Sequence, residues 1–189
     1  MSSAVALKKP KKLRPITKSD SGSTVFSTSL GWMGLTWNAG GLHRLTLGHD
    51  SPRKAADRIK DGAHAMSDPP AAIAELVERI QDFADGKDDD FLDVQLNLND
   101  LTTFQRSVVR HCRRIPIGKT MTYAQLAAKA GSPQAARAVG NVMASNRFAL
   151  IVPCHRVVGS GGSLGGYSAP TGLKMKRRLL EREGTLARA

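Results

Sequence analysis

Apolar residues between Val25 and Leu47 come in short runs that are separated by turn-forming glycines. Breaks at Gly31 and at the Gly40-Gly41 pair leave segments of strand length that contain β-branched and aromatic residues. This pattern predicts a small antiparallel sheet near the start of the chain.

A helical period replaces this pattern after residue 50. Ser51 is a suitable start for a first helix, and Pro69 or Pro70 opens a second helix that ends at Gly86. The apolar positions of the second helix recur at helical spacing: Ile73, Leu76, Ile80 and Phe83. Two helices are therefore expected to accompany the sheet.

The segment that follows the second helix is expected to be a loop and then a strand. The acidic run Asp88-Asp89-Asp90 predicts a solvated loop. Residues 94–98 alternate between apolar and polar side chains, which predicts a last strand. The chain becomes strongly basic just after this strand, so we place a domain boundary near residue 100.

The chain beyond residue 100 is predicted to be mainly helical. Thr102 or Thr103 is the expected N-cap of an amphipathic helix, which stops at the run Ile115-Pro116-Ile117-Gly118. The apolar positions of this helix are Phe104, Val108, Val109 and Cys112.

A pair of helices joined by a glycine turn comes next. The first is expected over residues 122–131, and the second runs from Ser132 to Met143 with Ser132 as its N-cap and Pro133 in its first position. This is a helix-turn-helix pattern. Helical hairpins that bind nothing share it, so the pattern alone leaves both interpretations open.

These elements predict an α+β protein with two domains. Residues 1–20 would be a basic disordered tail without the apolar core of a secretory signal. Residues 21–100 would form an N-terminal α/β domain with the small antiparallel sheet, and residues 101–189 a mainly helical domain with the helix-turn-helix and a strand that carries Cys154. The tail could add nonspecific affinity for DNA or act as a localisation signal.

Charge is distributed unevenly along the 189 residues. The net charge is +5 over residues 1–20, −6 over residues 21–100 and +13 over residues 101–189, where Glu181 and Glu183 are the only acidic residues. So basic a region is expected to bind a polyanion, and nucleic acid is the commonest one inside a cell. The alternative is a basic surface that serves solubility alone, which is less favoured because such a block repels itself.

The number of cysteines and the length of the apolar runs indicate where in the cell the protein is expected. Two isolated cysteines fit a reducing environment, and no apolar stretch approaches the roughly 18 residues of a membrane span. We therefore expect a soluble intracellular protein that makes no membrane contact. It would be cytoplasmic, associated with the nucleoid if the source is a bacterium and nuclear if the source is a eukaryote.

Cys154 lies in the apolar run Ile151-Val152-Pro153-Cys154-His155-Arg156-Val157-Val158-Gly159, which predicts a strand before a glycine-rich loop. A thiol beside a histidine is a candidate nucleophile, because the thiolate is the reactive form and needs a base. The alternative is a buried structural cysteine, which we expect of Cys112. A metal site would need three or four ligands at suitable spacing, so no metal is expected.

The second helix of the predicted pair carries mostly small residues: Ala135, Ala136, Ala138 and Gly140. Such residues cannot read base edges in the major groove, but they let a helix backbone approach the narrower minor groove. Arg137 is the one long cationic side chain on this stretch. It could clamp a phosphate, or it could fill the gap that a flipped-out base leaves in the duplex.

Five segments between residues 102 and 184 form a recognisable set. They are Ala136-Arg137-Ala138-Val139-Gly140, Asn146, Pro153-Cys154-His155-Arg156-Val157, Gly165-Gly166-Tyr167-Ser168 and Leu179-Leu180-Glu181-Arg182-Glu183-Gly184. On these segments the chain resembles the O6-alkylguanine-DNA alkyltransferases, also called methylated-DNA–protein-cysteine methyltransferases. The Pro-Cys-His-Arg run with its glycine loop is a highly specific signature. The likeness over residues 21–100 is looser and centres on residues 31–35.

The resemblance implies direct-reversal DNA repair after base flipping through the minor groove. The Cys154 thiolate would displace guanine from the alkyl or methyl group on its O6, and less well thymine from an O4 adduct. The thioether product would not be reversed, so each molecule would act once. His155 would take the thiol proton and Glu183 would hold the imidazole. Because neighbours on a strand point to opposite faces, a water could relay the proton.

Further roles are implied for residues around the cysteine. Tyr123 would donate a hydrogen bond near O6, Asn146 would order the cysteine strand, and Arg156 would anchor the structure through buried pairing. The substrate pocket would contain Val157, Tyr167 and Ser168, although Tyr167 could equally be a core residue. The implied DNA-binding residues are Tyr123, Ser132, Ala135, Ala136, Arg137, Gly140, Met143 and Ser160.

The implied partner is double-stranded DNA that bears O6-alkylguanine, bound by a monomer that could assemble cooperatively, and no cofactor is expected. Ala169-Pro170 stands where the family often has two glycines, which predicts a stiffer pocket lip and poorer acceptance of bulky alkyl groups. Two other classes of function stay open. One is an unreactive relative that only recognises alkylated bases, and the other is a thiol hydrolase or acyltransferase with a Cys-His pair.

Overall fold

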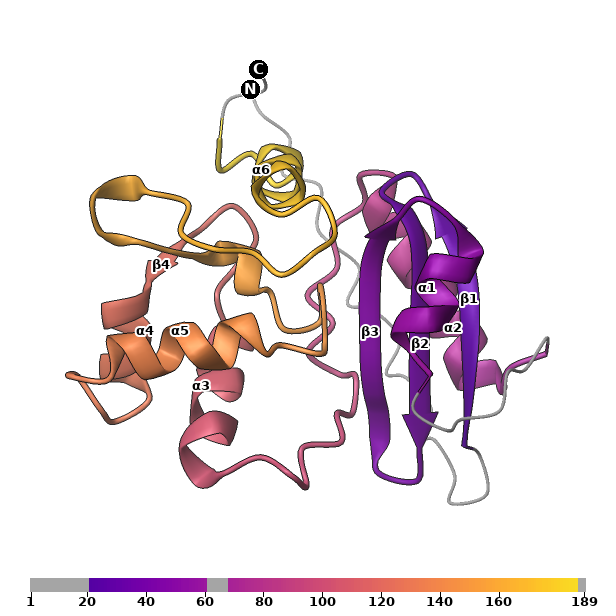
Figure 1. Cartoon of the computed structure of the whole chain (residues 1–189), viewed down its shortest axis with the longest axis horizontal. Coiled ribbons are helices and arrows are strands. Elements are labelled where there is room, and N and C mark those ends of the chain that lie inside the picture. Colours follow the sequence, from indigo (N-terminus) through magenta and orange to yellow (C-terminus); the bar gives the residue numbers. More distant parts are fainter. Residues whose placement is uncertain (1–20, 61–67, 187–189) are drawn as a thin grey trace, which may run out of the picture.

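The structure, a computed structural model, describes residues 21–60 and 68–186. An antiparallel sheet with its own two helices lies beside a second group of helices (Figure 1). This is the α+β arrangement that the sequence predicts. The predicted basic tail, residues 1–20, falls outside the described residues.

The sheet contains β1 (Gly22–Thr28), β2 (Gly31–Asn38) and β3 (Gly41–His49), which pair antiparallel in that order. The strand prediction for this region is confirmed. Gly41 occupies the turn into β3 with φ of 112°. A Cβ at this position would lie 2.5 Å from the carbonyl oxygen of Gln95, so the close approach of the two chains requires glycine.

Two helices cover opposite faces of the sheet, α1 (Pro52–Arg58) in front and α2 (Ala71–Ala84) behind (Figure 1). Ser51 caps α1 as predicted, because its hydroxyl accepts a hydrogen bond from the backbone N–H of Lys54. The predicted apolar positions of α2 are all buried. Since both faces are covered, β2 is buried without interruption from residue 33 to residue 37.

The predicted strand over residues 94–98 is wrong. The segment makes a single bridge between Leu96 and Leu42 at the edge of β3. It goes no further because the Asn97 side chain accepts a hydrogen bond from the backbone N–H of Asn99. Local side-chain bonds of this kind compete with the hydrogen bonds of a sheet.

The acidic run at residues 88–90 forms a loop as predicted, but it is not fully solvated. Arg79 on α2 binds Asp89 at 2.7 Å and Asp93 at 2.8 Å. The side chains of Arg79 and Asp89 are each only 12% exposed. This pairing fastens the loop to α2.

The helix after residue 100 is α3 (Thr103–Arg113), and Thr102 is its N-cap. Thr102 and Gln105 form a reciprocal capping box, with distances of 3.2 and 2.8 Å. The helix buries Val108, Val109 and Cys112, as the apolar period predicts.

The next two helices, α4 (Tyr123–Lys129) and α5 (Ala136–Ala144), pack against each other. The expected cap at Ser132 is wrong. Residues 132–135 form a turn that is closed by the backbone N–H of Ala135 on the carbonyl of Ser132, and α5 starts only at Ala136 without a side-chain cap. The backbone of Ser132 closes this turn instead of starting the helix.

Cys154 does not lie on a strand, which corrects the sequence prediction. Residues 154–156 form a short 3-10 turn, η1. Pro153 explains the change, because it has no N–H for a sheet and its carbonyl accepts from the N–H of Arg156. The strand β5 is limited to Val157–Val158 and pairs in parallel with β4 (Met121–Thr122).

The chain closes with η2 (Ser160–Gly162) and α6 (Leu173–Arg182). In Figure 1 α6 lies above α3, α4 and α5. The buried apolar residues form one continuous cluster that runs from Phe26 on β1 to Leu179 on α6. The division into two domains near residue 100 stays a prediction.

Candidate functional site

Asn146 holds the cysteine turn in place. Its Nδ2 donates to the carbonyl of Val152 at 2.9 Å and points at Sγ of Cys154 at 3.1 Å. Its Oδ1 accepts from the N–H of Phe148 at 3.0 Å. One amide therefore joins the chain that leaves α5 to the reactive turn, and it also places an N–H donor on the sulfur.

Cys154 is only 7% exposed. Burial raises the pKa of its thiol, while the hydrogen bond from Asn146 and the positive charge of Lys176 lower it. Because burial dominates, the resting group is the thiol. A nucleophilic role therefore needs a base close by.

The neighbouring His155 is fully buried, and its Nε2 lies 2.8 Å from Oε1 of Glu183. Burial raises the pKa of the Glu183 carboxyl, but the hydrogen bonds from His155 and Arg156 outweigh it and hold the pKa at about 2. The carboxylate is thus ionised and accepts the Nε2 proton. Burial lowers the pKa of His155 against the opposing effect of Glu183, so the ring is neutral and its Nδ1 carries the free lone pair.

Arg156 completes this buried group. Its guanidinium donates to both oxygens of Glu183, at 2.9 and 2.8 Å, and to the carbonyl of Ile115 at 2.6 Å. The end of α6, the cysteine turn and the segment after α3 are therefore tied together by one charge pair, in the way expected for Arg156.

Lys176 was not among the residues predicted for the site, and it is fully buried. Its ammonium donates to the carbonyl of Val157 at 2.6 Å and to the carbonyl of Leu164. Burial lowers its pKa to about 8. The lysine fixes the glycine-rich loop beside the cysteine. Its place on the apolar face of α6, three residues before Leu179, is the signal that could have identified it.

A pocket of about 410 Å³ opens on Cys154 from the helices, and we call it the helix-side pocket. Burial raises the pKa of Tyr123, so this residue keeps its hydroxyl proton. Ring and aliphatic side chains give the pocket the flat, apolar character that suits a nucleobase. The residues that line it are Tyr123, Gly140, Met143, Ala144, Cys154, Gly166, Tyr167 and Ser168.

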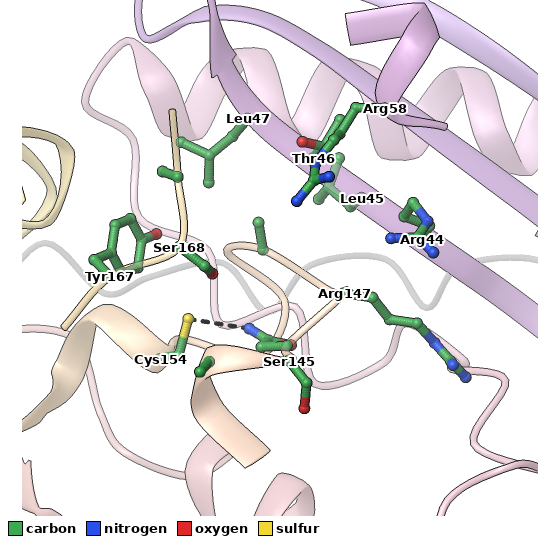
Figure 2. Close-up of a pocket in the computed structure, with 14 residues that line it drawn as sticks. Arg44, Leu45, Thr46, Leu47, Arg58, Ser145, Arg147, Cys154, Tyr167 and Ser168 are labelled. Carbon is green, nitrogen blue, oxygen red and sulfur yellow. Dashed lines mark hydrogen bonds between the residues drawn. The ribbon is translucent and has the colours of Figure 1, made fainter. Parts of the chain in front are cut away.

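A second cavity of about 210 Å³ reaches Cys154 from the sheet, and we call it the strand-side cavity (Figure 2). Arg44, Arg58 and Ser145 line it, together with Cys154 and Ser168. None of these three residues was expected from the sequence. They lie on β3, on α1 and after α5, and only the folded chain brings them together.

The structure places the predicted site residues in three groups. Asn146 is bonded to Cys154, and His155 and Arg156, the next two residues, are bonded to Glu183. Tyr123, Gly140, Met143, Tyr167 and Ser168 line the helix-side pocket, and Val157 is buried next to the cysteine turn. Arg137 is exposed on α5, Ala135 and Ala136 lie half-buried at its start, Ser132 is half-buried in the preceding turn, and Ser160 is exposed on η2.

Comparisons with known proteins agree on one family. A family model described as "6-O-methylguanine DNA methyltransferase, DNA binding domain" matches residues 103–185. A methylated-DNA–protein-cysteine methyltransferase of Mycobacterium bovis is 42% identical over 120 residues, which are 64% of this chain and 70% of that protein. The chain belongs to the methylated-DNA–protein-cysteine methyltransferase family. Its class of enzyme is the one that this name describes, a DNA-binding methyltransferase of DNA repair.

Other members of the methyltransferase family extend the likeness. The relative from Methanothermobacter thermautotrophicus is 42% identical over 118 residues, and the match spans 62% of this chain and 65% of that protein. The crystal structure of Mycobacterium tuberculosis OGT in complex with DNA superposes with a TM-score of 0.68 at 32% identity and covers 86% of this chain and 92% of that one. The O6-methylguanine-DNA methyltransferase of Pyrococcus kodakaraensis gives a TM-score of 0.62 at 25% identity, with 86% and 99% covered.

The described ranges, 21–60 and 68–186, contain no group of three or more His, Cys, Asp or Glu side chains placed to hold a metal ion. No helix in them has the length and the apolar character needed to cross a membrane.

Proposed function

We propose that this chain repairs DNA by transferring the alkyl group from O6 of guanine in duplex DNA to Cys154. The observation that carries the proposal is the position of the buried sulfur. Cys154 lines the helix-side pocket, its sulfur accepts a hydrogen bond from Asn146, and it is next in sequence to the His155–Glu183 pair. A sulfur enclosed in this way can meet only a small group that is delivered into the pocket.

The proton of the thiol goes to Nδ1 of His155, directly or through a water. This nitrogen is the basic one because Nε2 is engaged with Glu183, and the carboxylate stabilises the imidazolium that forms. The Asn146 N–H stabilises the thiolate, since hydrogen bonds to a charged form favour that form.

The thiolate then attacks the alkyl carbon. A bond from carbon to Sγ forms while the bond from carbon to O6 breaks, and the electron pair stays with guanine. Guanine is a poor leaving group as an anion, so a donor near O6 lowers the barrier. Tyr123 supplies the donor from the wall of the helix-side pocket, and guanine ends with the proton that the thiol lost.

The product is a thioether on Cys154. A carbon–sulfur bond of this kind has no leaving group that water could displace under mild conditions. Each molecule therefore reacts once. The same chemistry on O4-alkylthymine is slower, because a pyrimidine fills the pocket less completely.

The base must leave the duplex to react, because only a small part of Cys154 is exposed and a stacked base cannot reach into the helix-side pocket. Flipping costs a few kcal/mol. We assign this step to α5, whose small residues Ala136 and Gly140 let its backbone enter the minor groove. Arg137, exposed on the same helix, fills the gap in the stack.

Around α5 a wider surface contacts the DNA. Tyr123, Ser132, Ala135 and Ser160 lie at least partly exposed on α4, on the turn and on η2, and we assign them to DNA contact. Met143 is 4% exposed, so its role is in the wall of the helix-side pocket rather than on the DNA surface.

Peptide mass measurement tests the proposal. Incubation with a duplex that contains one O6-methylguanine is expected to add a methyl group to the peptide that contains Cys154. Cys154→Ala, incubated in parallel, is expected to gain none. An unmodified Cys154 peptide in the wild-type protein, or a methyl group on Cys112 instead, contradicts the proposal.

A further inference from the structure

Arg147 lies between α5 and the cysteine turn, directly after Asn146, and the proposed mechanism gives it no role. Its guanidinium donates to both carboxylate oxygens of Asp100 at 2.5 Å and to the carbonyl of Asn97 at 2.9 Å. The same group lies over the ring of Phe148, 5.1 Å from the ring centre. The side chain is only 15% exposed. Arg147 is therefore fixed to the segment that precedes α3.

The backbone around Arg147 is fixed as well, against the edge of β3. Its carbonyl accepts from the N–H of Leu45 at 2.7 Å, and the N–H of Ala149 donates to the carbonyl of Leu45 at 3.2 Å. The segment before α3 is bonded to the same strand, because the N–H of Asn97 donates to the carbonyl of Leu42 at 2.8 Å. The sheet, the segment before α3 and the chain after α5 thus form one hydrogen-bonded unit around Arg147.

The orientation of the Asn146 amide depends on the course of this chain. Its Oδ1 accepts from the N–H of Phe148, so the amide is oriented by the backbone on either side of Arg147. The Nδ2 of the same amide lies 3.1 Å from Sγ of Cys154. Hydrogen bonds weaken steeply when the donor turns away from the acceptor. A change in the course of residues 146–148 therefore removes the donor from the sulfur.

We propose that Arg147, paired with Asp100, is a positioning residue for alkyl transfer. The pair holds residues 146–148 in the course that keeps the Asn146 donor on the sulfur. Bidentate pairs between a guanidinium and a carboxylate have a defined geometry and are among the strong hydrogen-bonded pairs of proteins. The inference rests on the proposed function, because the rate that it concerns is the rate of that transfer.

Arg147 acts through Asn146 and is not itself a catalytic residue. Its side chain points away from Cys154 in Figure 2. Its charge is compensated by Asp100, whose pKa the hydrogen bonds from Arg147 lower to about 2. The carboxylate is thus ionised at neutral pH, and the ion pair persists there. Two other roles make different predictions: binding of a DNA phosphate, and a direct effect of the positive charge on the thiol.

The first measurement is the rate of methyl transfer within the saturated complex, beside the dissociation constant for undamaged duplex. We expect Arg147→Ala to lose about tenfold in the rate, because the thiolate loses one hydrogen bond, and to stay within about twofold in the dissociation constant. Asp100→Asn should also lose in the rate, since a neutral amide cannot form the bidentate ion pair.

Arg79→Ala is the matched control. Arg79 is likewise a guanidinium paired with carboxylates, and its side chain is 12% exposed. It also lies over a ring, 5.5 Å from the ring centre of Phe91. Because it ties the acidic loop to α2 and not the chain around Asn146, its loss should leave the transfer rate and the dissociation constant within about twofold of the wild type.

A double-mutant cycle tests whether Arg147 acts through Asn146. Arg147→Ala should slow the wild type about tenfold and the Asn146→Ala variant less than about twofold, because the donor is then already absent.

The pH dependence of Cys154 alkylation by iodoacetamide, followed by mass on the Cys154 peptide, gives a readout that needs no DNA. The pKa of the thiol should be higher in Arg147→Ala and in Asp100→Asn than in the wild type, because the thiolate loses its donor. If the charge of Arg147 acted on the thiol directly, Asp100→Asn would lower that pKa, since it leaves the guanidinium uncompensated.

Three results would overturn the proposal. The first is weaker DNA binding of Arg147→Ala at an unchanged transfer rate, which would show that Arg147 binds a phosphate. The second is a loss of rate that multiplies in full with the loss in Asn146→Ala, and the third is an unchanged or lowered pKa of Cys154 in Asp100→Asn.

Two further cases stay decisive. If Arg147→Ala does not fold, Asp100→Asn supplies the same readouts, because the Asp100 side chain is 58% exposed and the guanidinium stays in place. If the wild type transfers no methyl group, the proposed function fails, and the pH dependence of Cys154 alkylation still shows whether Arg147 positions Asn146.

Discussion

At the scale of single residues, the site depends on opposed shifts of pKa. Burial keeps the Cys154 thiol protonated and the His155 ring neutral, while hydrogen bonds from His155 and from the Arg156 guanidinium hold Glu183 ionised. The resting site is therefore a thiol, a neutral base and a carboxylate. This is the set of protonation states that a thiol nucleophile needs before its substrate arrives.

Glu183→Gln is predicted to lower both the rate of alkyl transfer and the stability. The amide cannot neutralise the imidazolium, so we expect the transfer rate to fall at least about tenfold. Arg156 loses its buried counter-charge, which costs about 3 kcal/mol in the free energy of unfolding. Urea denaturation and single-turnover kinetics measure the two effects. Glu78→Gln, on the exposed side of α2, is the control, and equal effects of both substitutions would contradict the prediction.

The stability is predicted to fall in two stages as the pH is lowered. His155 has a lowered pKa in the folded state, so it stabilises the fold fully above about pH 6.5 and this contribution is lost as the pH falls below that value. Glu183, with a pKa of about 2, adds a second loss from about pH 4.5 downward. Denaturation at a series of pH values measures both stages. His155→Gln should shrink the first stage, to which His49 also contributes because burial lowers its pKa as well, and His111→Gln should leave it unchanged. A first stage that His155→Gln does not reduce would contradict the assignment.

Asn146→Ala is predicted to slow alkyl transfer about tenfold or more, because the thiolate loses an N–H donor. Binding of the damaged duplex should change little, since the amide points at the sulfur and at a carbonyl. Separate measurements of the dissociation constant and of the rate within the complex test this. Asn99→Ala, in an exposed loop, is the control. A loss confined to DNA binding would show that Asn146 does not act in the transfer step.

At the scale of secondary-structure elements, α5 is the element proposed to contact DNA, and the cysteine turn is the one proposed to react.

The sequence predicts the sheet, α1, α2 and α3 well, because their apolar periods and their caps at Ser51 and Thr102 are local signals. It fails at the strand of Cys154 and at the cap by Ser132, where a proline and a turn closed by backbone bonds override propensity.

The site was only partly predictable, for a physical reason. Cys154, His155 and Glu183 stand in a specific motif, so a resemblance finds them. Lys176 and Arg58 do not, because their positions depend on segments far away in the chain: Lys176 binds a carbonyl of the glycine-rich loop, and Arg58 lines the cavity that opens on Cys154. Contacts of this kind form only on folding.

Arg137→Ala is predicted to affect base flipping more than DNA binding. If the side chain fills the gap in the stack, transfer from a paired O6-methylguanine should slow about tenfold or more, and transfer from one opposite an abasic site should slow less, because flipping is then cheaper. A phosphate clamp would instead lower the slope of log K against log salt by about 1 with no such difference. Lys129→Ala, exposed on α4, is the control.

At the scale of the whole molecule, the sheet and the helical part share one buried cluster and bonds at the edge of β3. Leu45 there donates to the carbonyl of Arg147 at 2.7 Å and accepts from Ala149 at 3.2 Å. The strand-side cavity lies at this junction, so its shape depends on both parts. The charge is concentrated beyond residue 100, at net +13, on the part that carries Cys154.

This charge predicts how binding responds to salt. Affinity for undamaged duplex should fall at least about tenfold between about 50 mM and about 200 mM salt, because bound cations release counterions from DNA. The rate of transfer within the complex should stay constant, since the sulfur is buried. Fluorescence anisotropy and single-turnover kinetics measure the two quantities. An affinity that does not change with the salt concentration would contradict a role for the basic surface in DNA binding.

The central claim is that Cys154 accepts one alkyl group from DNA and is then spent. Titration of the protein with an excess of duplex that carries labelled O6-methylguanine tests it most directly, with the label counted on the protein and on the DNA. We predict a plateau at one methyl group per chain, with none transferred by Cys154→Ala. Repair that continues beyond one equivalent, or label that reaches the Cys154→Ala variant, would contradict the account.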